Sequence, residues 1–180
     1  MHFRVVLALA VVPATLSAQA SPANPITTTL RGFGYYGAWL RQAFDSIPEA
    51  RYGFKPSPPQ QSIGFIAQHL EHANQELCRI IGGEPAPRTG KDSLPETVKA
   101  EWPKDTLVAR VQASLQFCAA AMSKVTDASL AEVITVGPPG AERQAPRVRW
   151  VILLITDLAE HYAQLASYMR ILGMVPPSAR

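Results

Sequence analysis

Four stretches of the chain carry apolar residues at helical spacing, and segments rich in proline and glycine separate them. Apolar side chains at intervals of three and four residues form one face of an α-helix, whereas proline and glycine interrupt helices. The sequence therefore predicts an all-α fold, a four-helix bundle. The expected helices span about residues 30–44, 62–82, 106–124 and 147–173.

The connection between the second and third helices, residues 84–104, is long and contains several prolines and charged residues. This composition is typical of a surface segment, with one short helical turn expected near residues 96–101. A long link can join consecutive helices across a bundle instead of through a tight hairpin. We therefore expect one domain, residues 30–177, built as an antiparallel bundle with a long crossover connection and no β-strand.

Residues 1–20 have the features of a secretory signal peptide. They comprise a basic start with Arg4, an apolar run over residues 5–12 and a small-residue ending, Ala18-Gln19-Ala20. Cleavage there would leave residues 21–29 as a polar leader and direct the protein to the periplasm or the exterior. The alternative is a permanent N-terminal anchor, although the apolar run is shorter than the roughly 20 residues that a membrane-spanning helix needs. We expect no membrane span after cleavage.

Export changes the interpretation of Cys78 and Cys118, the two cysteines of the chain. Thiols in an oxidising compartment tend to pair, and these two lie in different predicted helices. A disulfide across that separation would stabilise the fold by about 4 kcal/mol in the chain-entropy description. The alternative is a pair of buried free thiols that pack as small apolar side chains.

Composition narrows the class of protein further. Hydrophobic residues make up 47% and charged residues 17% of the chain, which is the balance of a globular protein and not of a disordered one. The net charge of +3 comes from basic residues that are spread singly along the sequence. Because there is no basic patch with interleaved aromatic residues, we do not expect nucleic-acid binding.

Three residues are candidate ligands of a divalent metal ion. Asp157 and His161 are four residues apart, which places a carboxylate and an imidazole on one face of the fourth helix. His69 lies on the expected inward face of the second helix. Two imidazoles and one carboxylate suit zinc, nickel or ferrous iron and leave coordination positions open. The alternative is that His161 simply bonds to Asp157 on a solvated face.

Other polar residues near these positions have weaker claims. His72, three residues after His69, could be a fourth ligand but points toward the flank of its helix. Gln164 and Tyr168 follow His161 on the same ridge, where they could orient a ligand or simply pack between helices. Glu160 faces elsewhere and is expected to be a solvated charge. No separate general base is evident, so the catalytic residues stay unassigned.

Two segments of the sequence resemble the DinB-like superfamily. Residues 157–177, DLAEHYAQLASYMRILGMVPP, are similar to the last helix of that family, in which a metal-ligating His is followed three residues later by Gln and then by Gly and Pro-Pro. Residues 62–70, SIGFIAQHL, are similar to its second helix. By this resemblance His69 matches the first ligand of the family and His161 the third. The second, usually a His four residues before the third, is Asp157 here.

The resemblance implies a DinB-like four-helix bundle with a metal-dependent activity, either a hydrolase or a thiol-dependent transferase, on a small molecule that the family does not identify. It also implies that two copies could pair as a homodimer. Export favours hydrolysis, because low-molecular-weight thiols are chiefly cytosolic. The alternative function is a non-catalytic exported bundle that binds a metal, a small ligand or a partner protein.

Overall fold

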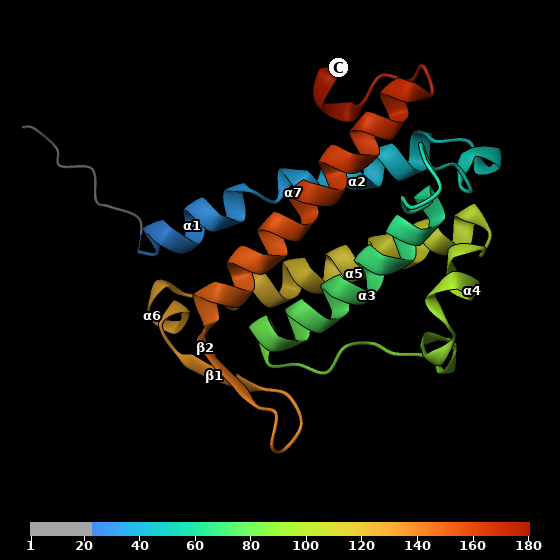
Figure 1. Cartoon of the computed structure of the whole chain (residues 1–180). Helices are drawn as coiled ribbons and strands as arrows, with labels where there is room; N and C mark the ends of the chain where they lie inside the picture. Colours follow the sequence, from blue (N-terminus) through green and yellow to red (C-terminus); the bar gives the residue numbers. More distant parts are fainter. Residues whose placement is uncertain (1–22) are drawn as a thin grey trace, which may run out of the picture.

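The computed structural model describes residues 23–180 and is mostly helical. Four long helices pack side by side as a bundle, which confirms the predicted all-α four-helix fold (Figure 1). They are α2 (Tyr35–Ser46), α3 (Ile63–Gly82), α5 (Lys104–Ser123) and α7 (Arg147–Ile171). The predicted signal peptide, residues 1–20, lies outside the described residues.

The contacts between helices fix their directions. Asn74 of α3 bonds to Ser114 of α5, and Cys78 pairs with Cys118 one turn further along, so the two helices run parallel with a constant offset of 40 residues. Helix α7 is antiparallel to α3, because Tyr168 contacts residue 61 at one end while Arg147 contacts residue 81 at the other.

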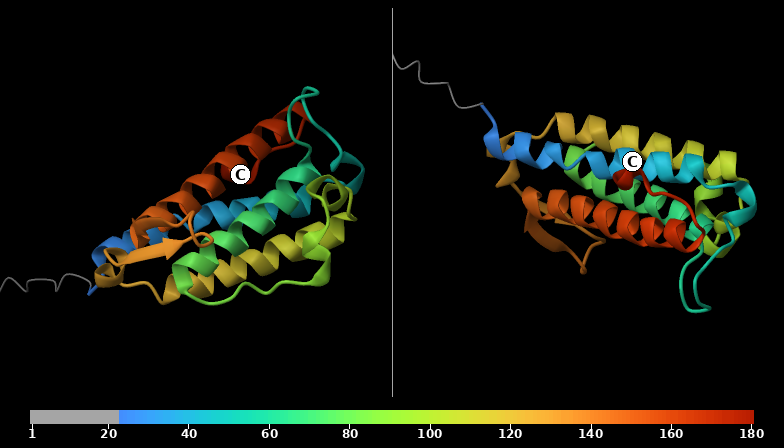
Figure 2. Two further views of the ribbon diagram at one scale, coloured as in Figure 1. Left: turned by 60° about the horizontal axis from the view of Figure 1, so that its bottom comes forward. Right: turned by 90° about the horizontal axis from the view of Figure 1, so that it is seen from above.

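Residues 83–103 make the parallel arrangement of α3 and α5 possible, because they return along the length of the bundle before α5 begins (Figures 1 and 2). This segment is the predicted long crossover. It contains the 3-10 helix η2 (Gly90–Ser93) and the short helix α4 (Glu96–Ala100), which matches the predicted helical turn. A Cβ atom on Gly64 would collide with the carbonyl of Ala100, so glycine allows α4 to lie directly on α3.

Local sequence signals set the ends of α3. The Ser62 hydroxyl accepts a hydrogen bond from the backbone N–H of Phe65, as an N-cap does, and Gly83 ends the helix with a positive φ of 74°. The helices enclose a continuous apolar core. Its largest fully buried apolar members are Tyr168, Phe44, Leu40, Ile47, Ile63, Ile66, Leu70, Ile81, Leu107, Leu165 and Met169.

The first predicted helix is in fact two helices, and it begins earlier than expected. Helix α1 (Pro25–Gly32) arises within the segment predicted to be a leader, and a break at residues 33–34 separates it from α2. The Asp127 carboxylate accepts hydrogen bonds from the backbone N–H groups of Ile26 and Thr27, which caps the start of α1. Arg31 in turn donates to the carbonyls of Met122 and two later residues at the end of α5. These long-range contacts left no local signal in the sequence.

The expectation of no β-strand was wrong. Strands β1 (Val133–Val136) and β2 (Arg143–Pro146) form an antiparallel hairpin between α6 (Asp127–Leu130) and α7. Each strand has only four residues, so the alternation of apolar and polar side chains is too short to be distinguished from a loop. Two further 3-10 helices, η1 (Glu49–Arg51) and η3 (Pro177–Ala179), complete the structure.

The predicted disulfide between Cys78 and Cys118 is present and joins α3 to α5, with the two Cα atoms 5.0 Å apart. Beside it the interface carries a charged cluster. Arg110 of α5 donates hydrogen bonds to Glu71 of α3, at 3.0 Å, and to Asp92 of the crossover. This interface is therefore held by a covalent bond and by the ion pairs of Arg110 with Glu71 and Asp92.

None of the helices in residues 23–180 combines the length and the apolar character that crossing a membrane requires.

Candidate metal centre

The three residues predicted as metal ligands meet at the interface of α3 and α7. Each of His69, Asp157 and His161 offers a nitrogen or oxygen atom, and these atoms lie within 4.8 Å of one another. His161 is buried, whereas the other two are half-buried. Side chains separated by 88 residues in the sequence (157 minus 69) are thus brought to one point.

The helix directions explain how the residues converge. Because α3 and α7 are antiparallel, His69 lies opposite His161, and the centroids of the two imidazole rings are 4.9 Å apart. Asp157 precedes His161 by one helical turn, so its Oδ1 lies 3.5 Å from the Nε2 atom of His161. The ring of Phe65, one turn earlier in α3, lies nearly parallel to that of His69, with the centroids 6.5 Å apart and an interplanar angle of 11°.

Asp157 contributes a polar atom that the protein itself leaves unpaired. Its Oδ2 is buried and has no hydrogen-bond partner among the described residues. An unpaired buried oxygen costs about 1–3 kcal/mol, more for a charged group, so such an atom usually has a partner or a function. A carboxylate oxygen beside two imidazoles fits a divalent cation well.

A chain of hydrogen bonds fixes the orientation of the His161 ring. The Tyr168 hydroxyl donates to the carbonyl of Gln61, at 3.1 Å, and accepts from the Nε2 group of Gln164, at 3.0 Å. The Oε1 atom of Gln164 then faces His161 Nδ1 at 3.2 Å. Because a backbone carbonyl can only accept, the direction of the whole chain is fixed, and Nδ1 of His161 is the donor. Sequence reasoning had left the roles of Gln164 and Tyr168 open.

This tautomer has a direct consequence for the opposite ring nitrogen. In the neutral imidazole, Nε2 of His161 presents a lone pair toward Asp157 Oδ1, so two acceptors face each other. Only a proton or a cation bound between these two atoms removes the repulsion between them. Burial by itself lowers the pKa of His161, but the hydrogen bond and the charge of Asp157 outweigh it and hold the pKa above its ordinary value. The site therefore attracts positive charge at the Nε2 position.

The pKa of His69 is shifted in the opposite direction. Burial and then the positive charge of His161 lower its pKa below the ordinary value for an imidazole. The neutral form, which is the form that binds metals, is thus favoured at His69 near neutral pH. The two imidazoles differ because Asp157, whose Oδ1 lies 3.5 Å from Nε2 of His161, raises the pKa of that ring against the effect of burial, whereas at His69 burial prevails.

The other candidates fall outside this group. His72 is half-buried, but none of its atoms belongs to the cluster of ligand atoms. Glu160 is exposed, as expected of a solvated charge. The reading of His161 and Asp157 as a pair on a solvated face does not fit the structure, because only 7% of His161 is exposed.

Sequence reasoning missed two contributors to the site. Phe65 stacks on His69 from one turn earlier in α3, and its position four residues before a candidate ligand was a usable signal. Gln61 contributes its backbone carbonyl, which any residue would supply. A main-chain acceptor of this kind leaves no trace in the sequence.

The sequence and the fold resemble known proteins. Residues 38–165 match the model of the DinB superfamily. A DinB-like protein from Bacillus cereus ATCC 10987 has a similar fold, with a TM-score of 0.64 and 20% identity, over 84% of this chain and 95% of that one. A conserved protein from Enterococcus faecalis gives a TM-score of 0.61 at 14% identity, over 81% and 95% of the two chains. No curated protein matches this chain.

Proposed function

This chain belongs to the DinB superfamily, and from that premise we propose that it is an exported metal-dependent hydrolase or transferase. His69, Asp157 and His161 would hold one divalent ion between α3 and α7. The observation that carries the proposal is the electrostatics of this site. The hydrogen-bonded chain through Gln164 turns the His161 Nε2 lone pair toward Asp157, whose other oxygen is buried without a partner.

The three donor atoms fit the divalent ions that the sequence predicts. Two imidazole nitrogens and one carboxylate oxygen suit zinc, nickel or ferrous iron, and three protein ligands leave positions for substrate and solvent. The carboxylate of Asp157 also supplies a negative charge that a third histidine would not. The site therefore favours a dication more strongly through charge than a site of three neutral imidazoles does.

The residues of the chain have separable roles in such a reaction. A divalent ion bound there would supply Lewis-acid chemistry, polarising an electrophile and lowering the pKa of water or a thiol. Gln164 and Tyr168 hold the His161 ring so that Nε2 stays available. Phe65 places an apolar ring parallel to that of His69 beside the site. Among hydrolysis and thiol transfer we favour hydrolysis of a small molecule, because an exported protein meets few low-molecular-weight thiols.

Metal analysis of protein purified without a histidine tag tests the site. We expect about one zinc, nickel or iron ion per chain in the wild type and none in His161→Ala. His72→Ala is the matched control, because it removes a nearby imidazole that lies outside the cluster, and it should retain the ion. A metal-free wild type whose thermal stability does not respond to zinc would favour the alternative, a non-catalytic bundle that binds a ligand or a partner.

Catalysis and export need tests of their own. A screen of ester, amide and phosphoester substrates should reveal an activity that a chelator abolishes and that His161→Ala lacks. Absence of any such activity in the metal-loaded protein would leave a metal-binding bundle. Export predicts that the full chain, expressed in a bacterial host, is recovered outside the cytoplasm with Ser21 as its first residue. Recovery in the cytoplasm with residues 1–20 retained would contradict it.

A further inference from the structure

A second site lies on a face of α7 adjacent to that of the metal centre. A cavity of about 770 Å³ is lined by α1, α2, α5 and α7. Cavities of about 300–1,000 Å³ with mostly apolar walls are typical of small-molecule sites. The cavity uses Leu154 and Leu158 of α7, whereas the metal centre uses Asp157 and His161, so the two sites share no residue.

Small side chains on α2 create this space. Gly37 and Ala38 of α2, and Gly34 just before it, line the cavity where α2 faces α5, and Ala119 lines it from α5. A Cβ atom on Gly37 would lie 3.0 Å from a methyl group of Leu115, so glycine lets this leucine of α5 pack directly against α2. The walls are otherwise apolar, with Leu30, Phe33, Leu115, Met122, Leu154, Ile155 and Leu158 among them.

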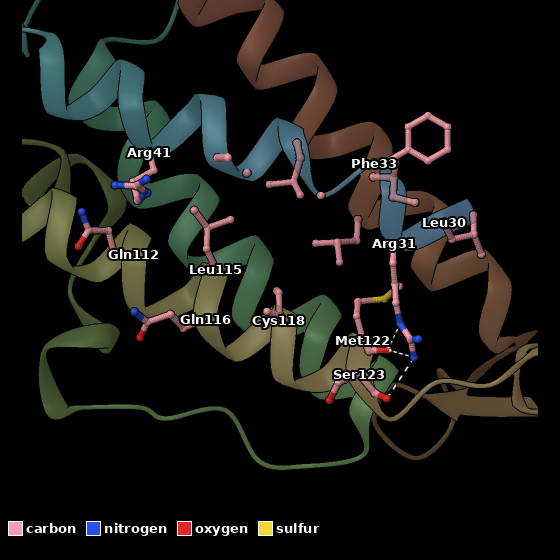
Figure 3. A pocket seen from close by; sticks show the side chains of 17 residues that line it. Leu30, Arg31, Phe33, Arg41, Gln112, Leu115, Gln116, Cys118, Met122 and Ser123 are labelled. Carbon is pink, nitrogen blue, oxygen red and sulfur yellow. Dashed lines mark hydrogen bonds between the residues drawn. The ribbon is translucent and has the colours of Figure 1, made fainter. Parts of the chain in front are cut away.

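The polar groups of the cavity are distributed unequally. Figure 3 shows Arg41 and Gln112 at one end, and Leu30, Arg31 and Met122 at the other. The guanidinium of Arg31 already donates hydrogen bonds from Nε and Nη2 to carbonyls at and just after the end of α5. Arg41 has only a loose ion pair with Asp45, at 3.7 Å, and its side chain is half exposed. Neither aspartate nor glutamate lines the cavity within the described residues.

The cavity is elongated along α5. Its lining on α5 runs from Gln112 to Ser123, which corresponds to about 16 Å at the helical rise per residue. An elongated apolar space with a loosely paired, half-exposed cation at one end and no acidic lining complements a molecule with an apolar chain and an anionic head. It does not complement a cationic or a fully polar molecule.

We propose that this cavity binds an amphipathic organic anion of the medium-chain fatty-acid type. The apolar chain lies between α2 and α5 on Leu115, Ala119 and Leu158, and the carboxylate pairs with Arg41. The proposal does not depend on the metal centre.

Calorimetric titration of the full, disulfide-bonded chain with decanoate tests the site. We expect saturable binding of one decanoate, with decanol and decyltrimethylammonium at least about tenfold weaker because they lack the charge-assisted pair with Arg41. Arg41→Gln should remove most of the preference for decanoate over decanol. Equal affinities for decanoate and decyltrimethylammonium would overturn the assignment of the head group.

Two alanine substitutions test the location. Ala119→Leu places a larger side chain into the cavity and should weaken decanoate binding about tenfold or more. Ala120→Leu adds the same side chain at the next exposed position of α5, outside the lining, and should leave binding unchanged. Both variants should keep the wild-type metal content, which separates this test from that of the metal centre.

Three further results would also overturn the proposal. The first is the absence of saturable decanoate binding by the wild type. The second is equal binding by Ala119→Leu and Ala120→Leu. The third is a wild-type dimer in sedimentation that Ala119→Leu dissociates and Ala120→Leu does not, which would assign the cavity to contact with a second copy of the chain.

Discussion

Helix α3 buries polar groups against two neighbouring helices, and the two interfaces differ in whether the buried carboxylates have partners. Against α5, the Glu71 carboxylate and the Arg110 guanidinium bond to each other, and the disulfide adds a covalent link. Against α7, the His69 and His161 rings and the Asp157 carboxylate converge, but Oδ2 of Asp157 has no partner. Each interface has buried polar atoms without a partner among the described residues: Asn74 Oδ1 and Arg110 Nε at the first, and Asp157 Oδ2 at the second. The difference is that the carboxylates of the first interface have a cationic partner, whereas an oxygen of the Asp157 carboxylate has none.

This difference separates polar groups that hold a fold together from polar groups that serve a function. A buried charge that is paired and hydrogen-bonded can persist for structural reasons alone. A buried carboxylate oxygen that no donor reaches has a cost that the fold does not recover. We therefore expect substitutions at the α3–α5 interface to change the free energy of unfolding, and substitutions at the α3–α7 interface to change metal binding.

Removal of the disulfide should have the largest effect of all. Replacing both Cys78 and Cys118 by alanine should lower the free energy of unfolding by about 4 kcal/mol, because the loop they close no longer restricts the unfolded chain. Denaturant unfolding measures this loss. A reducing agent should destabilise the wild type to a similar extent but leave the double variant unchanged. A loss below about 1 kcal/mol would show that the α3–α5 interface does not depend on the covalent link.

Disruption of the charged cluster at the same interface should have the second-largest effect on stability. Arg110→Ala leaves the carboxylates of Glu71 and Asp92 without their shared partner, and only 4% and 10% of these two side chains are exposed. We expect a loss of about 3 kcal/mol in the free energy of unfolding. Arg79→Ala is the control, because its ion pair with Glu76 is more than 40% exposed on both sides and should contribute under about 1 kcal/mol. If both variants lost the same free energy of unfolding, buried and exposed ion pairs would not differ in their contribution to stability.

The sequence predicted the regular parts of this molecule well. Apolar spacing and the proline and glycine breaks located the four long helices, because both signals are local. The disulfide followed from the number of cysteines and their positions in separate helices. Helix α1 and the β-hairpin were missed, since α1 depends on contacts between Ile26, Thr27 and Asp127 and the strands are very short.

The metal centre was predictable in part for a similar reason. The spacing of Asp157 and His161 placed them on one helical face, and His69 lay on the expected inward face of another helix. Their convergence needed the antiparallel pairing of α3 and α7, which the sequence suggested only through the bundle topology. The direction of the chain from His161 through Gln164 to Tyr168 depends on a backbone carbonyl, and no side-chain pattern encodes it.

Metal binding at the α3–α7 interface should depend on pH. The pKa of His161 is raised, chiefly by Asp157 against the effect of burial, so its proton must leave before Nε2 can bind a metal. The apparent affinity for zinc should therefore decrease as the pH falls through that raised pKa, which lies above about 6.5, by about tenfold for each pH unit below it. The pKa of His69 is lowered, so His69 adds proton competition only below about 6.5.

Titration calorimetry with zinc between about pH 8 and pH 6 measures this dependence. Asp157→Asn removes the charge that raises the pKa of His161, so its zinc affinity should be weaker but less dependent on pH over that range. A wild-type affinity that does not change with pH would exclude His161 as a ligand.

The smallest effect should come from the end of the hydrogen-bonded chain that orients His161. Tyr168→Phe keeps the aromatic ring, which is almost fully buried, and removes only the hydroxyl that joins Gln164 to the carbonyl of Gln61. The Gln164 amide can then rotate and offer its Nε2 group to His161, which would place the proton of the neutral ring on the metal-binding nitrogen. We expect zinc affinity to fall by about tenfold or less. A purely structural role would lower the free energy of unfolding by about 1 kcal/mol with unchanged zinc affinity. Nitrogen chemical shifts of His161 in the metal-free protein separate the two outcomes, because only loss of the orienting chain shifts the ring between its tautomers.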